Sequence, residues 1–207
     1  MYYLKHILFS VAISGCLSAQ GNEKTPDSQQ LQELLQPISS LSAQFEQQTT
    51  DVNGVEIQQA IGQLQLAQPY KLHWVVSEPM PQRLISDGQT LWLYDEDLEQ
   101  VIIQSVDSSI NSTPIMLFSG DLQRLNLLYS VLQISKGIFE LTPKQNESLF
   151  ASVQLGFSNK VPTSLVMTDN LGQITRINLT SVSVNREIPA DLFNFKIPDE
   201  IDVIRND

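Results

Sequence analysis

A chain of 207 residues with 42% hydrophobic and 17% charged residues can form one domain with a substantial core, and its composition excludes a disordered protein. The formal net charge of -11 disfavours nucleic acid or an anionic lipid surface as the main partner, because like charges repel at long range. No apolar run reaches the length of about 18 residues that indicates a spanning helix, so we expect a soluble protein unless a lipid is attached.

The first residues have the layout of a secretory signal. Lys5 precedes a short apolar stretch at residues 7–13, and small residues follow. Two processing sites fit this layout. Leu17-Ser18-Ala19 favours cleavage before Gln20, whereas Ile13-Ser14-Gly15-Cys16 is typical of a bacterial lipobox. The sequence leaves lipidation of Cys16 open.

We therefore divide the chain into three parts. Residues 1–19 are predicted to be a signal peptide, residues 20–27 a polar spacer without apolar periodicity, and residues 28–207 a single domain. Since Cys16 is the only cysteine, the mature domain has no internal disulfide.

The domain is predicted to begin with an amphipathic helix. Its apolar residues recur at three- and four-residue steps, and Asp27 or Ser28 can cap it. They are Leu31, Leu34, Leu35, Ile38 and Leu41. From Leu41 to Gln47 the apolar residues alternate with polar ones, which predicts a half-buried strand directly after the helix.

A series of short strands follows. Asn53-Gly54 marks a tight turn, because both residues tolerate positive φ. Short connections favour neighbouring antiparallel strands. The predicted strands are 56–66, 71–76, 82–86, 90–94, 100–105, 131–134, 138–142, 151–158, 162–167 and 174–184. Helical segments at 113–118, where Thr113 precedes Pro114, and at 121–128 interrupt them.

The resulting fold class is mainly β with helices (α+β). About eleven antiparallel strands in one domain curl strongly or close, because sheet twist accumulates with each strand. The helical segments remain to cover the sheet. Apolar residues on both halves of such a sheet form either an ordinary filled core, which the residue pattern slightly favours, or an unfilled apolar cavity.

Catalytic and metal chemistry find little support in the sequence. His73 is the only histidine beyond the signal, and alternation directs it away from Leu72 and Trp74, toward solvent or a neighbouring strand. The acidic run at 95–99 lacks the spacing of a calcium loop, and Gly88 fits a hairpin turn better than a phosphate loop. We predict no enzyme, no metal and no cofactor.

Several motifs together resemble one protein family. They are SSLSAQF at 39–45, GQLQLAQPYKLHW at 62–74, ISDGQTLWLYD at 85–95, LEQV at 98–101, TPIML at 113–117 and FNFKIP at 193–198. In order and spacing they are similar to the LolA family of periplasmic lipoprotein carriers, over a region from about Leu31 to Pro198.

This resemblance implies both a structure and a role. The structure is an incomplete, strongly curved β-barrel under a helical lid, with a hydrophobic cavity for lipoprotein acyl chains. The role is that of a monomeric periplasmic chaperone in a Gram-negative bacterium, which receives lipoproteins from an inner-membrane ABC transporter (LolCDE-like) and passes them to an outer-membrane receptor (LolB-like). Acyl chains need such shelter, because each methylene left in water costs about 0.8 kcal/mol.

The resemblance and the strand alternation together predict the cavity lining. The candidates are Leu64, Leu66, Leu72, Trp74, Leu84 and Leu93 from strands, with Leu31, Leu35, Ile115 and Met116 from the lid. One position departs from the family, in which an arginine before the proline is thought to latch the lid. Here that position is Gln68, so we expect a weaker latch unless Lys71 or Arg83 replaces it.

Two other functions remain as alternatives. A lipidated Cys16 would make the chain a membrane-anchored lipid- or lipoprotein-binding module of the same fold. A hydrolase acting on lipid or glycan would need carboxylates such as Asp87 and Asp95 to converge near a cleft.

Overall fold

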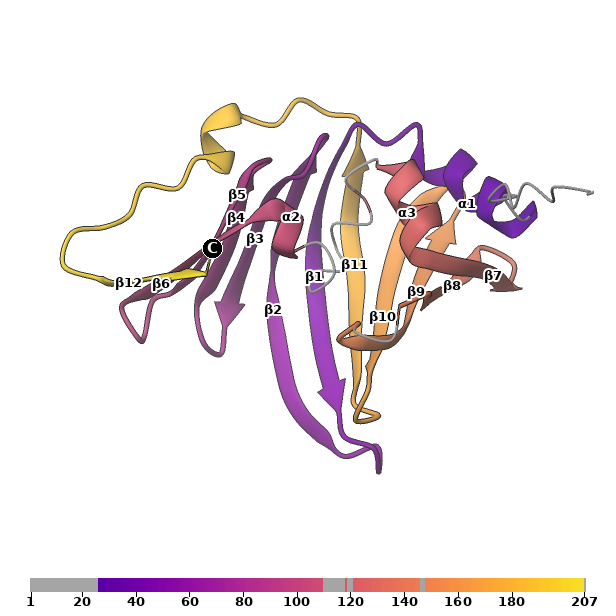
Figure 1. The fold of residues 1–207 in the computed structure, drawn as a ribbon, viewed down its shortest axis with the longest axis horizontal. Coiled ribbons are helices and arrows are strands. Elements are labelled where there is room, and N and C mark those ends of the chain that lie inside the picture. Colours follow the sequence, from indigo (N-terminus) through magenta and orange to yellow (C-terminus); the bar gives the residue numbers. More distant parts are fainter. Residues whose placement is uncertain (1–25, 110–117, 119–120, 146–147, 207) are drawn as a thin grey trace, which may run out of the picture.

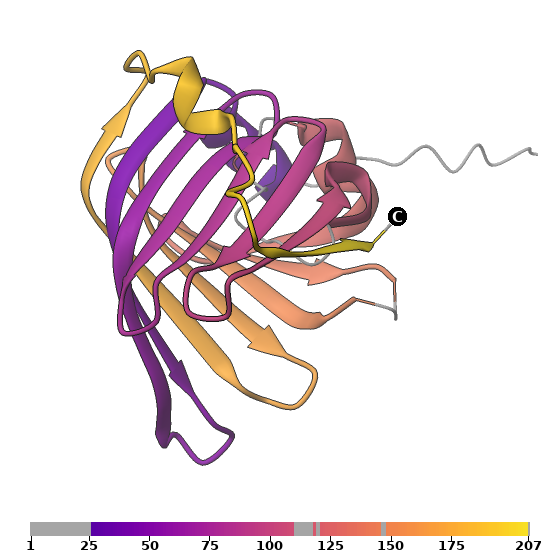
Figure 2. The same cartoon turned by 90° about the vertical axis from the view of Figure 1, so that its left-hand side faces the viewer.

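One large open sheet forms the framework of the protein in a computed structural model that describes residues 26–109, 118, 121–145 and 148–206. Its twelve strands lie in the order β12-β6-β5-β4-β3-β2-β1-β11-β10-β9-β8-β7. The sheet curves strongly without closing, and helices α1 and α3 lie at one end of its inner face (Figures 1 and 2). The predicted fold class is confirmed.

Each of the eleven predicted strands is confirmed to within a few residues at its ends. The strands are β1 Ser40–Thr50, β2 Glu56–Ala67, β3 Lys71–Glu78, β4 Gln82–Asp87, β5 Thr90–Asp95, β6 Gln100–Ser105, β7 Tyr129–Ser135, β8 Ile138–Pro143, β9 Phe150–Ser158, β10 Val161–Asp169, β11 Ile174–Val184 and β12 Asp202–Asn206. The twelfth, β12, was not predicted. It pairs with β6 in parallel, whereas the other strand pairs are antiparallel.

The helical elements differ more from the prediction. Helix α1 spans Pro26–Leu35, because proline suits the first helical position, and so begins two residues early. Asp27 therefore lies within the helix instead of capping it, and its carboxylate accepts a hydrogen bond from the backbone N–H of Gln133 on β7 at 3.0 Å. Helix α3 spans Leu122–Leu128 as predicted.

Two further short helices were not predicted. Helix α2 spans Val106–Ser109 at the end of β6, and the 3-10 helix η3 spans Ala190–Phe193. The predicted helical turn at 113–118 lies outside the described residues except for Phe118, which is buried.

The main core fills the inner face where α1 and α3 cover it. Leu31 of α1 and Leu125 of α3 are buried together with Phe139, Leu155 and Leu165 from the strands. Helix α1 contacts β7 and α3, while α3 also contacts β7 (Figure 1). We call this region of the inner face, from β7 to β11 with its helices, the covered half.

A smaller apolar cluster lies on the outer face of β3–β6. There Ile85, Val101 and Ile103 are buried together with Phe193 of η3. The ring of Phe195 lies 5.4 Å from the ring of Tyr94, measured between centroids. The C-terminal segment therefore covers the outer face of these strands and leaves their inner face to other uses.

Candidate functional site

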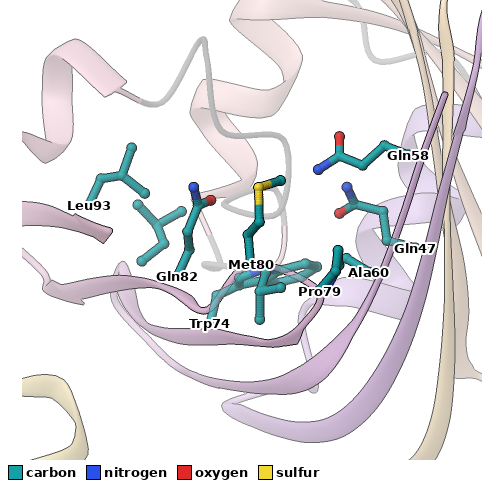
Figure 3. Close-up of a pocket in the computed structure, with 10 residues that line it drawn as sticks. Gln47, Gln58, Ala60, Trp74, Pro79, Met80, Gln82 and Leu93 are labelled. Atoms are coloured by element: carbon teal, nitrogen blue, oxygen red, sulfur yellow. The ribbon is translucent and has the colours of Figure 1, made fainter. Parts of the chain in front are cut away.

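A hollow of about 190 Å³ opens on the inner face of β2–β5, beyond the covered half (Figure 3). Its lining joins apolar side chains to three glutamine amides. The lining residues are Gln47, Gln58, Ala60, Trp74, Val76, Pro79, Met80, Gln82, Leu84 and Leu93. We call the inner face of β2–β6 around this hollow the open half.

Strand register explains why apolar residues gather here. Leu64, Trp74, Leu84 and Leu93 are directly paired across four consecutive strands, so they form one lateral row. Leu64 is fully buried, whereas the other three are only half-buried. This row therefore runs from the core into the hollow.

The border between the two regions depends on a glycine. Phe45 of β1 faces Gly62 of β2, and its ring stacks on Trp74 with centroids 3.9 Å apart. A Cβ at Gly62 would lie 1.9 Å from the carbonyl oxygen of Val75 and 2.6 Å from the Phe45 ring. Only glycine lets the phenylalanine lie flat across β2 and form one wall beside the hollow.

The predicted lining residues fall into three groups. Trp74, Leu84 and Leu93 line the hollow. Five others are buried in the core beneath the helices, namely Leu31, Leu35, Leu64, Leu66 and Leu72. Ile115 and Met116 lie outside the described residues. The three glutamines of the hollow were not predicted, although the alternation that found Trp74 places them on the same face.

Gln68, at the predicted latch position, bonds to the segment after α1. Its Nε2 donates to the backbone oxygen of Ile38 at 2.5 Å. The two suggested substitutes lie on the other face, where Lys71 stands 5.9 Å above the Phe193 ring and Arg83 pairs with Glu96 at 2.6 Å. Neither cation takes the place of the missing arginine.

A second polar contact connects the same turn to α3. The Tyr70 hydroxyl donates to the carboxylate of Asp121, which also accepts from the backbone N–H of Arg124 at 2.9 Å and so caps the helix. Arg124 in turn bonds Asp107 at 2.9 Å. Desolvation, the hydrogen bond to Asp121 and its negative charge raise the pKa of Tyr70 to about 12, so the phenol stays protonated.

Helices α1 and α3 are also bonded to each other. The Ser28 hydroxyl bonds Asn126, and Nε2 of Gln32 donates to the backbone oxygen of Leu122 at 3.4 Å. The two helices and the β2–β3 turn therefore form one connected cover.

The groups considered for catalysis serve structure instead. His73 bonds Gln65 at 2.8 Å, so of the two predicted directions, solvent or a neighbouring strand, it takes the second. Burial, followed by the charge of Arg83, lowers its pKa. Asp87 and Asp95 each accept backbone N–H groups of their own turns. No cluster of metal-binding side chains occurs in the described part of the chain, and none of its helices is long and apolar enough to cross a membrane.

Comparison with known proteins agrees with this geometry. Residues 36–196 match the family model described as outer membrane lipoprotein carrier protein LolA. The outer-membrane lipoprotein carrier protein of Chromohalobacter salexigens is 40% identical over 193 residues, which cover 91% of this chain and 90% of that protein. The protein of the same name from Pseudomonas fluorescens (strain Pf-5) is 35% identical over 99% of this chain and 100% of its own length.

Solved structures share the fold at low sequence identity. An uncharacterized conserved protein from Thermus thermophilus superposes with a TM-score of 0.52 at 11% identity, covering 86% of this chain and 99% of that one. A putative outer membrane lipoprotein-sorting protein domain from Vibrio parahaemolyticus gives a TM-score of 0.50 at 13% identity, covering 84% and 97%.

Proposed function

The chain belongs to the LolA family of outer membrane lipoprotein carrier proteins, and from this membership we propose that its open half holds the acyl chains of lipoproteins in transit through the periplasm. Members of this family are carriers and not enzymes. The observation that supports the proposed site most directly is the row of half-buried Trp74, Leu84 and Leu93, an apolar surface that the helices leave uncovered.

The hollow must enlarge to hold its cargo. Even drug-sized ligands occupy pockets of about 300–1,000 Å³, whereas this hollow measures about 190 Å³. Leu31 and Leu35 of α1 are buried against the same core that contains Leu64, Leu66 and Leu72. Outward movement of α1 would expose these leucines and extend the hollow into a cavity lined by the residues that the sequence predicted.

The polar contacts of the β2–β3 turn then act as the latch. Gln68 holds the chain after α1 and Tyr70 holds α3 through Asp121, so both must release for the helices to move. Each contact is a single hydrogen bond, with a net strength of about 1 kcal/mol for the neutral Gln68 amide and about 1.5–3 kcal/mol for Tyr70, whose partner is a carboxylate. Such a cover opens at low cost and allows the cargo to leave again.

The proposed route is the one that the family resemblance implies. An inner-membrane ABC transporter supplies the lipoprotein, and an outer-membrane receptor with a cavity of higher affinity removes it. The carrier itself uses no covalent chemistry. Incubating the purified mature domain with lipoprotein-bearing inner-membrane vesicles and ATP should release lipoprotein as a soluble one-to-one complex. No release from vesicles that are active with a known carrier would contradict the proposal.

The mature N-terminus distinguishes this role from an anchored one. We propose that residues 1–19 are removed and that residues up to 25 connect the cut site to α1. Mass spectrometry of the secreted protein should give an unmodified N-terminus near Gln20. A diacylated Cys16 would instead indicate a membrane-anchored binding module, because a shuttle cannot cross the periplasm while tethered.

A further inference from the structure

We propose that Gln47, Gln58 and Gln82 recognise the uncharged amide groups that a lipoprotein carries beside its acyl chains, and thereby favour lipoprotein over anionic phospholipid. The glycerol esters are common to both molecules, so the selection depends on amide against phosphate. This inference rests on the proposed function, because it assumes that acyl chains enter the hollow. It adds a basis for selection among acylated molecules, all of which share the same apolar chains.

The three amides surround the apolar part of the hollow. They come from β1, β2 and β4, and Figure 3 shows Gln47 and Gln58 together on one side, with Met80 between them and Gln82. Gln47 pairs with Ala60, so Gln58 is its diagonal neighbour across the two strands. A lipid with its chains on Trp74 would bring its polar linkage to these side chains.

The amides have unused hydrogen-bonding capacity. Gln82 donates through Nε2 to the carboxylate of Asp95 at 2.8 Å, which leaves its oxygen as an acceptor. Gln47 and Gln58 make no side-chain hydrogen bond to the rest of the described chain. An amide side chain offers two donors and one carbonyl acceptor, a set that matches both the C=O and the N–H of another amide, which a phospholipid lacks.

The charges near the hollow disfavour a phosphate group. No positively charged side chain is among the described residues that line it. The cationic and imidazole groups of the same strands, Lys71, His73 and Arg83, alternate onto the outer face and have partners there. The carboxylate of Asp95, which accepts the hydrogen bond from Gln82, adds a negative charge at the rim of the hollow. A phosphate would therefore lose its water without gaining a cation.

The test compares two lipids with identical chains but different heads. The probes are an N-acetylated dipalmitoylglyceryl-cysteine peptide with an amidated C-terminus, which is uncharged, and dipalmitoylphosphatidylglycerol, each titrated into the mature domain. Trp74 reports binding, and Trp92→Phe removes the only other tryptophan, which lies on the outer face beside Phe195. We expect the peptide probe to bind at least about tenfold more tightly, the gain from two net hydrogen bonds.

Variants then assign the preference to the amides. Gln47→Leu with Gln58→Leu should weaken binding of the peptide probe about tenfold and leave the phospholipid nearly unchanged. Gln58→Arg should strengthen phospholipid binding, because it supplies the missing cation. Gln63→Leu, an exposed position on the opposite face of β2, is the matched control and should change neither.

The possible outcomes distinguish a failure of this inference from a failure of the proposed carrier function. Equal affinity of the native domain for both probes, or a preference that survives the double leucine change, would overturn the selection by amides and leave the carrier role intact. Failure of both probes to bind, with the domain folded, would overturn the proposed function and this inference with it.

Discussion

The covered and open halves of the inner face are built by the same strand alternation but reach different degrees of burial. In the covered half, Phe139, Leu141, Val153, Leu155 and Leu165 are fully buried. In the open half, Trp74, Leu84 and Leu93 stay half-buried. Other inner-face leucines of β2–β5, such as Leu64, Leu72 and Leu91, are buried in the main core. The difference lies in the cover, since α1 and α3 contact β7, whereas among the described helices it is the short α2 that contacts β5 and β6, and the C-terminal segment covers β3–β6 from outside.

This contrast suggests separate roles for two regions of one sheet: the covered half stabilises the fold, and the open half is the proposed binding surface. Buried apolar area supplies most of the free energy of folding, so the covered half holds the domain together. The open half leaves apolar surface partly exposed to water. On the proposed function, a bound acyl chain would cover this surface, and its burial would contribute to the free energy of binding. The following changes break or sharpen that division.

The largest effect should come from shortening a leucine in the covered half. Leu155→Ala removes a side chain with no exposure and leaves a cavity, so we expect the free energy of unfolding to fall by about 3–4 kcal/mol. Leu93→Ala in the open half should cost only about 1 kcal/mol, because its side chain already meets water. Urea unfolding followed by circular dichroism measures both.

Acyl binding should show the reverse order. Leu93→Ala should weaken binding of the dipalmitoyl peptide probe several-fold, while a Leu155→Ala domain that remains folded should bind almost normally. Equal losses of stability at the two positions would mean that the halves are not distinct.

Gly62→Ala tests the border between the halves. The new methyl group meets a backbone carbonyl and the Phe45 ring, so we expect a loss of about 2–3 kcal/mol of unfolding free energy. Phe45→Leu combined with Gly62→Ala should keep most of this loss, because the clash with the Val75 carbonyl remains. Full rescue by the smaller side chain would show that the ring alone requires glycine.

The sequence predicts which residues lie on the inner face of the sheet. It does not predict which of them are buried under helices. Alternation places Leu64, Trp74 and Leu93 on one face, because side chains on a strand repeat every two residues. It does not say which of them a helix will cover, since that depends on contacts between residues far apart in the chain. The set of lining candidates therefore mixed buried core leucines with residues of the hollow.

Two other features had weaker signals. Strand β12 was missed because its five residues contain two apolar side chains, at 203 and 204, and it pairs with β6, a strand about one hundred residues earlier. The glutamines of the hollow were passed over because polar residues on a strand are usually solvated. The available signal was that each glutamine lies an even number of residues from an inward apolar residue of its own strand, namely Phe45 on β1, Leu64 on β2 and Leu84 on β4.

The proposed latch should determine how firmly α1 and α3 stay on the covered half. Gln68→Arg should strengthen the contact with the Ile38 carbonyl, since hydrogen bonds from a charged donor are about twice as strong as neutral ones. Tyr70→Phe should weaken the contact with α3 by about 1.5–3 kcal/mol, because the lost hydrogen bond has a charged acceptor. Amide hydrogen exchange in α1 and α3 should slow in the first variant and accelerate in the second. Unchanged exchange in both would show that these contacts do not hold the cover.

The smallest expected effect is a pH dependence at the same contact. Desolvation raises the pKa of Asp121, but the hydrogen bonds from Tyr70 and the Arg124 backbone and the Arg124 charge outweigh it, so the pKa lies below its ordinary 3.8. A carboxyl with a lowered folded-state pKa stabilises the protein above its unfolded-state value and loses that contribution as pH falls through the folded-state value. The contribution should begin to fall below about pH 4 and be lost only below the folded-state pKa. It should stay under about 1 kcal/mol, because Asp121 is partly exposed and solvent screens its charge.

Asp121→Asn isolates this term from the other carboxylates. Asp51 and Asp95 also have lowered pKa values, held by backbone hydrogen bonds of their turns, so the native protein loses stability in acid for several reasons. The Asp121→Asn variant retains Asp51 and Asp95 and lacks only the contribution of the Asp121 charge. The difference in urea midpoint between the native protein and the variant should therefore shrink from pH 7 to pH 3. A constant difference would mean that the charge of Asp121 adds nothing to the closure of the cover over the covered half.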